Sequence, residues 1–127
     1  MSFTLIDLGS ENFEFRASVW NWKTALEIIR TFDVVSEGKL RQLNYAATGT
    51  KVTPEEAQEI GERIRDEVLP KLGPGKRIFA DLSVTDRPDD GTFYRDEDEN
   101  WKNYSADYEW LKELSEFCFK SKGFQVF

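Results

Sequence analysis

The chain has 127 residues with 24 acidic against 17 basic side chains, and its net charge of −7 makes nucleic acid and anionic membranes poor partners. It contains no histidine, which excludes Ser-His-Asp and Cys-His catalysis and histidine-type zinc sites within one chain. Carboxylate chemistry and hard-cation binding remain open, and a basic protein partner suits the charge. We therefore favour a non-catalytic protein.

A single cysteine, Cys118, allows no internal disulfide, so a reducing cytoplasm is the expected location. Because Cys118 falls on the inner stripe of an expected helix with no cation nearby in sequence, we expect a buried structural thiol. No apolar run approaches the ~20 residues that a membrane-spanning helix needs. The first residues lack a basic start followed by a continuous apolar stretch, so we expect no signal peptide.

The first part of the chain predicts a hairpin followed by a helix. Residues 3–8 and 13–17 are expected strands, since apolar and polar residues alternate in the second of them. A helix is expected to begin at Ser18 or Asn21 and to end near Phe32. We expect a mixed connection to follow, anchored by Leu40, Leu43 and Tyr45 or forming a short strand there.

Residues 53–72 give the strongest structural signal in the chain. Thr53 is a good N-cap, and Glu56 is placed three residues later to complete a capping box. Apolar residues then recur at spacings of three and four, which predicts an amphipathic helix. Pro70 is expected to kink or end this helix, and the glycines and proline of 73–75 stop it.

The last part of the chain predicts a strand, a polar loop, a helix and a terminal strand. Residues 77–84 alternate as a strand does, and residues 86–100 form an acidic loop with seven acids and two arginines. Ser105 is expected to cap a helix that runs to about Lys122. Residues 124–127 are expected to pair with the N-terminal hairpin.

These elements predict one α+β domain over residues 1–127. Three main helices would pack on a small, mostly antiparallel sheet. We expect this sheet to contain the N-terminal strands, the segment near Ile78 and the C-terminal strand.

The acidic loop is the first candidate site, because its acids lie between aromatic residues. Acids steer a basic partner and aromatic rings supply buried contact area. The alternative is that the rings pack into the domain and the acids only solvate the loop. The candidate protein-binding residues are Phe93, Tyr94, Asp96, Glu97, Asp98, Glu99, Trp101 and Tyr104.

The same loop partly fits a twelve-residue calcium loop. Asp86, Asp90 and Glu97 occupy the first, fifth and twelfth positions, with a glycine at the sixth. Pro88 stands where a ligand oxygen is expected at the third position, and the preceding segment reads as a strand where a calcium hand needs a helix. Calcium is therefore one possible ligand, and a plain solvated loop is the other interpretation.

Trp20, Asn21 and Trp22 form a second unusual cluster. Two tryptophans two residues apart face different directions on a helix, so one is expected in the core. The other could line a small-molecule pocket with Asn21 as a polar contact. The alternative is that both rings are packing residues and Asn21 is a cap.

Three segments of the chain together resemble a family of small uncharacterised bacterial proteins. The resemblance implies a bacterial single-domain protein and supplies no activity or site residues. The long acidic insert before the last helix departs from the more compact pattern of that family. The residues that carry the resemblance are Phe15-Arg16-Ala17 with Trp20-Asn21-Trp22, Asn44-Tyr45 with Gly49 and Val52 to Ala57, and Leu114 with Phe117-Cys118 and Gly123 to Phe127.

The leading hypothesis is a non-catalytic acidic interaction domain of the bacterial cytoplasm. An immunity-type protein, which masks a basic toxin or enzyme surface, is one concrete version. A calcium-binding module or cation-dependent enzyme that uses Asp86, Asp90 and Glu97 is the first alternative, and a small-molecule binder is the second.

Overall fold

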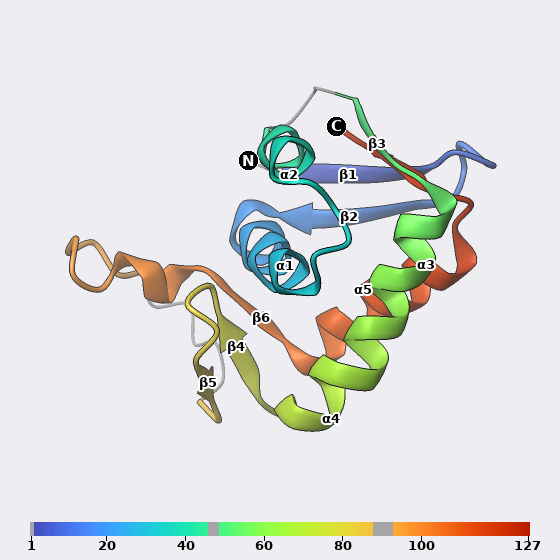
Figure 1. Ribbon diagram of the computed structural model, residues 1–127. Coiled ribbons are helices and arrows are strands. Elements are labelled where there is room, and N and C mark those ends of the chain that lie inside the picture. Colours follow the sequence, from blue (N-terminus) through green and yellow to red (C-terminus); the bar gives the residue numbers. More distant parts are fainter. Residues whose placement is uncertain (1, 46–48, 88–92) are drawn as a thin grey trace.

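The computed structural model describes residues 2–45, 49–87 and 93–127 and confirms the α+β class (Figure 1). Two small antiparallel sheets pack with helices around one core. The elements in chain order are β1 (Ser2–Asp7), β2 (Glu14–Ser18), α1 (Val19–Phe32), α2 (Glu37–Leu43), β3 (Thr50–Val52), α3 (Pro54–Arg63), the π turn η1 (Ile64–Val68), α4 (Leu69–Leu72), β4 (Arg77–Phe79), β5 (Val84–Thr85), the 3-10 turn η2 (Asn100–Asn103), β6 (Ser105–Asp107), α5 (Tyr108–Lys120) and β7 (Phe124–Val126).

The first sheet joins the two ends of the chain. Its strand order is β2-β1-β7-β3, and every neighbouring pair is antiparallel. Leu5 of β1 lies opposite Phe15 of β2 on one side and Val126 of β7 on the other. The expected N-terminal hairpin and its pairing with the C-terminal strand are therefore both confirmed.

The segment near Ile78 belongs to a second sheet, which differs from the single sheet we expected. Only Arg77–Phe79 form β4, and the chain then turns back into β5, so that Ile78 pairs with Val84. The Asp81 carboxylate accepts the Ser83 N–H at 2.9 Å, which holds the turn. Leu82 has the left-handed φ of 72° within it. Strand β6 pairs with the other edge of β4.

Helix α1 begins where the sequence predicts, with the Ser18 side chain accepting the Asn21 N–H. The following segment is helical as well, which differs from the mixed connection we expected. Ser36 caps α2 by accepting the Lys39 N–H, and the helix buries Leu40 and Leu43.

The predicted capping box on α3 is present with both of its hydrogen bonds: the Glu56 N–H donates to the Thr53 hydroxyl and the Thr53 N–H to the Glu56 carboxylate. Pro70 does not end the helical segment, which continues to Leu72. A proline ring crowds the carbonyl four residues before it, here Asp66, and that residue lies in the wide π turn η1.

Helix α5 begins later than the sequence suggested. Ser105 lies in strand β6, and Asp107 is the N-cap that accepts the Trp110 N–H at 2.8 Å. The helix packs closely on α3, where the Ser115 hydroxyl donates to the Gly61 carbonyl. Cys118 is buried as expected, and burial raises the pKa of its thiol to about 12. Within the described ranges, no helix is long and apolar enough to cross a bilayer.

Candidate functional site

An exposed group of rings joins helix α1 to the chain on both sides of η2. The ring of Trp20 lies 4.9 Å from that of Tyr104 and 5.9 Å from that of Phe93, measured between centroids. Trp20 is 38% exposed and Phe93 is 58% exposed. We call Trp20, Phe93 and Tyr104 the aromatic patch. Residues 73 positions apart in the chain thus form one surface, which no local sequence pattern indicates.

The hydrogen bonds around the aromatic patch fix its position. The Asn21 amide donates to the Ser105 carbonyl at 2.9 Å, which ties α1 to β6. The Ala80 N–H donates to the Tyr104 carbonyl at 3.0 Å, which ties the same segment to the turn after β4. One bond is to a carbonyl of β6 and the other joins the residues directly after β4 and before β6, so the Tyr104 ring is presented from an ordered scaffold.

A protrusion carries the acidic residues away from the body of the domain. Figure 1 shows the chain before β6 extending from the second sheet, on the side opposite α3. At the base of this protrusion, the Asn103 side-chain oxygen accepts the Tyr94 N–H and the Asn103 amide donates to the Tyr94 carbonyl, both at 2.8 Å. At its end the N–H groups of Glu99 and Asn100 both donate to the Asp96 carbonyl. We call residues 96–99 the acidic tip.

Most of the acidic tip's charge is uncompensated. Glu99 pairs with Lys102 at 3.3 Å, whereas Asp96, Glu97 and Asp98 have no side-chain partner among the described residues. Trp101 stabilises the acidic tip, since its indole N–H donates to the Asp98 carbonyl at 3.1 Å. The tip therefore presents several carboxylates to solvent on an internally hydrogen-bonded turn.

Lys102 and Phe79 connect the remaining aromatic residues of the loop. The Lys102 ammonium lies 5.5 Å from the ring centroid of Tyr94 and 5.8 Å from that of Trp101. The Trp101 ring packs edge-on against Phe79 of β4, with centroids 5.2 Å apart. Tyr94 and Trp101 thus stabilise the protrusion, while the aromatic patch is the exposed part of the candidate protein-binding set.

The three residues of the expected pocket cluster lie in different surroundings. Trp22 is fully buried, and its indole N–H donates to the Leu43 carbonyl at 2.9 Å. Asn21 serves the cap and the bond to β6, with its side-chain oxygen accepting from the Ser18 hydroxyl. Of the three, only Trp20 belongs to the aromatic patch. There it contacts Phe93 and Tyr104, which we had assigned to a separate site from the sequence.

The residues proposed for calcium are only partly described. Asp90 and Pro88 lie outside the described residues, while Asp86 and Glu97 are exposed. Within residues 2–45, 49–87 and 93–127, no three acidic or cysteine side chains gather as a metal site would require. Calcium binding through this loop stays a prediction, and a calcium titration followed by thermal unfolding would test it.

Sequence reasoning overlooked Lys23, which lies beside the aromatic patch. Its ammonium lies 5.5 Å from the centroid of the Tyr104 ring. Lys23 follows Trp20 by three residues on one helix, so the helical spacing already placed the two side chains on one face. The ring that Lys23 covers comes from a distant segment, which the spacing could not identify.

Comparisons of the chain with models of known protein families, with curated proteins and with solved structures gave no match. The site must therefore be interpreted from its own geometry.

Proposed function

We propose that this protein is a non-catalytic interaction domain that binds a basic protein through the acidic tip and the aromatic patch. The observation that carries this is that one protrusion holds three uncompensated carboxylates and the exposed ring of Phe93, which meets the exposed ring of Trp20 from α1. Tryptophan and tyrosine are enriched among the residues that dominate binding energy at protein interfaces.

The two parts of the surface would act at different stages of binding. The carboxylates of the acidic tip attract a positively charged surface over roughly a Debye length, about 8 Å at physiological salt. The aromatic patch then buries apolar area once the surfaces touch. An immunity-type protein, which covers a basic toxin or enzyme surface, would use this division of roles in a bacterial cytoplasm.

Affinity capture with charge-matched variants tests this function. The tip variant combines D96N, E97Q, D98N and E99Q, and the control combines E62Q, E109Q, E113Q and E116Q. All eight side chains are exposed, and both variants lose four negative charges. The control acids lie on α3 and α5 in the body of the domain, so the two variants differ in where the charge is removed.

We expect the wild type and the control to retain the same basic protein in stoichiometric amount from lysate of the source organism. The tip variant should lose it, and rising salt should release it from the wild type. A third variant, Phe93→Ser, should weaken retention without changing its salt dependence, because it removes apolar contact only. Equal retention by the tip variant and the control would contradict the proposed function.

A further inference from the structure

A groove separate from the acidic tip opens between α1, α2, the β4–β5 turn and η2. Its volume is about 500 Å³, within the range of small-molecule sites. Leu26 and Leu40, both buried, contribute to its lining. Trp101, Tyr104 and Asn44 also line the groove. The groove thus combines apolar, aromatic and polar residues in one hollow.

The Trp101 ring is held in place for a ligand to pack against. Its indole N–H donates to the Asp98 carbonyl, and its ring rests edge-on against Phe79 at 5.2 Å between centroids. The Tyr104 backbone is fixed through its carbonyl, which accepts the Ala80 N–H, and its ring packs on that of Trp20 with centroids 4.9 Å apart. Rings that are fixed before binding lose little entropy when a planar ligand packs against them.

The cations of the groove are unusual in so acidic a chain. Arg30 is neutralised by Glu27 at 2.6 Å and Glu37 at 2.9 Å. Lys23 contacts the Tyr104 ring but pairs with no carboxylate among the described residues, and Arg41 has no side-chain partner there. Two cations that line one hollow without carboxylate partners favour an anionic ligand.

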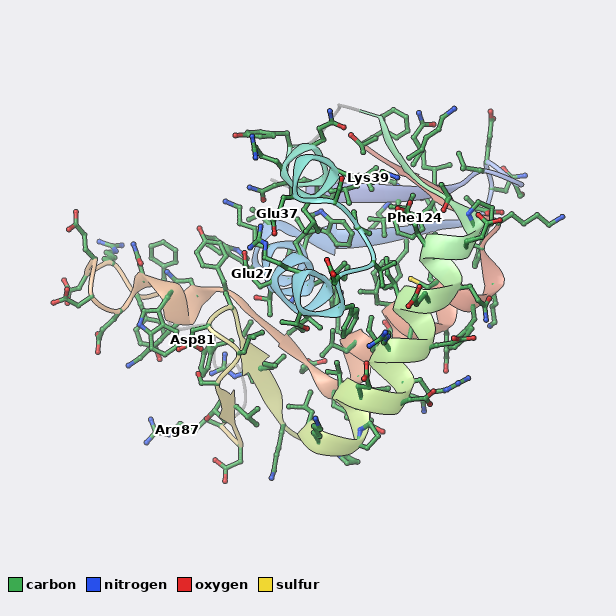
Figure 2. All side chains as sticks on the ribbon, viewed as in Figure 1. Glu27, Glu37, Lys39, Asp81, Arg87 and Phe124 are labelled. Atoms are coloured by element: carbon green, nitrogen blue, oxygen red, sulfur yellow. The ribbon has the colours of Figure 1, made fainter. Side chains whose placement is uncertain are left out.

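The acids of the groove limit how much negative charge that ligand can carry. Glu27 and Asp81, both labelled in Figure 2, line the groove together with Lys23, Arg30 and Arg41. With Glu37, which also pairs with Arg30, three cations face three carboxylates, so the groove has no surplus positive charge beyond the unpaired Lys23 and Arg41. One Asp81 oxygen already accepts the Ser83 N–H and hydroxyl, at 2.9 and 2.6 Å. A dianion or polyphosphate would place excess negative charge near these two carboxylates.

We propose that this groove binds a small aromatic monocarboxylate, with its ring against Trp101 and Tyr104 and its carboxylate on Arg41 and Lys23. The guanidinium fork of Arg41 suits bidentate contact with a carboxylate. This ligand is opposite in charge to the basic protein proposed for the acidic tip. The groove is therefore a second site, although it shares the Tyr104 ring with the aromatic patch.

Nuclear magnetic resonance titration of the purified full chain tests the groove without any protein partner. Indole-3-acetate is the probe, benzylamine the cation of similar size, and adenosine monophosphate the aromatic dianion. The groove variant combines K23Q and R41Q. Its matched control combines K112Q and K120Q, which remove two exposed cations from α5.

We expect indole-3-acetate to shift the Trp101 indole N–H and the amides of Lys23 and Arg41, saturating with a Kd of about 1 mM or tighter. The groove variant should bind at least about tenfold more weakly, and the control should match the wild type. Benzylamine and adenosine monophosphate should bind more weakly than indole-3-acetate. Equal affinity of the groove variant and the wild type, tighter binding of either comparison compound, or no saturable shift at the groove would overturn the proposal.

Discussion

The α3–α5 pair and the protrusion use aromatic and apolar residues in opposite ways. In the pair, Leu111 and Leu114 are buried, and Phe117 packs on Phe124 of the first sheet with centroids 5.6 Å apart. On the protrusion, Phe93 is mostly exposed although it touches Trp20. Figure 1 shows the two regions on opposite sides of α1. Apolar area that stays in water contributes little to stability, so the exposed rings are available for binding.

The two regions also differ in how their charges are arranged. On α3 and η1, Arg63 pairs with both Glu59 and Glu67 along one helix face. On the acidic tip, three of the four carboxylates lack such partners among the described residues. Ion pairs within a helix cancel the local field, whereas unpaired acids extend it into solvent. The difference assigns stability to the body and is consistent with the recognition role that we propose for the protrusion.

Truncating one apolar side chain in each region should give the most unequal changes in the free energy of unfolding. Leu111→Ala should lower the free energy of unfolding by about 3 kcal/mol, because it leaves a cavity at a fully buried position on α5. Phe93→Ala should change it by no more than about 0.5 kcal/mol, since most of that ring is already in water. Denaturant unfolding of both variants measures the difference. A loss at Phe93 as large as that at Leu111 would show that the protrusion is part of the core.

Two glycine substitutions should change stability in opposite directions. A Cβ on Gly61 would lie 3.1 Å from the Ser115 carbonyl oxygen and 3.2 Å from the Cys118 Cβ, so Gly61→Ala should cost a net of about 1 kcal/mol despite better helix propensity. A Cβ on Gly38 in α2 meets no atom within 4 Å, so Gly38→Ala should stabilise by about 0.5 kcal/mol. Thermal unfolding of the two variants shows whether each substitution raises or lowers the stability. A stabilising Gly61→Ala would mean that α3 and α5 pack less closely.

The smallest expected effect concerns Glu56, which accepts hydrogen bonds from Lys39 at 2.7 Å and from the Thr53 N–H at 2.9 Å. Burial alone would raise the pKa of Glu56, but these bonds outweigh it and lower the pKa below the ordinary value of 4.5. Its charge therefore stabilises the folded state above that ordinary value, and this contribution is lost as the pH falls through the lowered pKa.

Glu56→Gln keeps a side-chain acceptor for the capping box and removes the charge. It should cost about 0.5 kcal/mol at pH 7 and progressively less as the pH falls below the ordinary carboxyl pKa. Unfolding measured in urea across that pH range checks the trend, with Glu62→Gln as the exposed control on the same helix. If the loss of stability in Glu56→Gln did not change with pH, it would come from the altered shape of the side chain and not from its lost charge.

The site was only partly accessible to prediction. The acids and rings of residues 93–104 are adjacent in the chain, so composition alone predicted either a binding surface or a solvated loop there. The contact between Trp20 and Phe93, and the groove that Lys23 shares with Arg41, depend on segments that meet only after folding. Hydrophobic periodicity gives the face of a helix but not the partner on that face.

Elements with local signals could be predicted from the sequence: the start of α1 at Ser18 or Asn21, the capping box of Thr53 and Glu56, and the alternation of β2. Side chains within three or four residues create these signals, so they do not depend on the rest of the fold. The hairpin of residues 77–85 within a second sheet and the placement of Ser105 in a strand depend instead on contacts between distant segments. Strand pairing joins residues far apart in the chain, and its free energy depends on which neighbours the whole fold supplies.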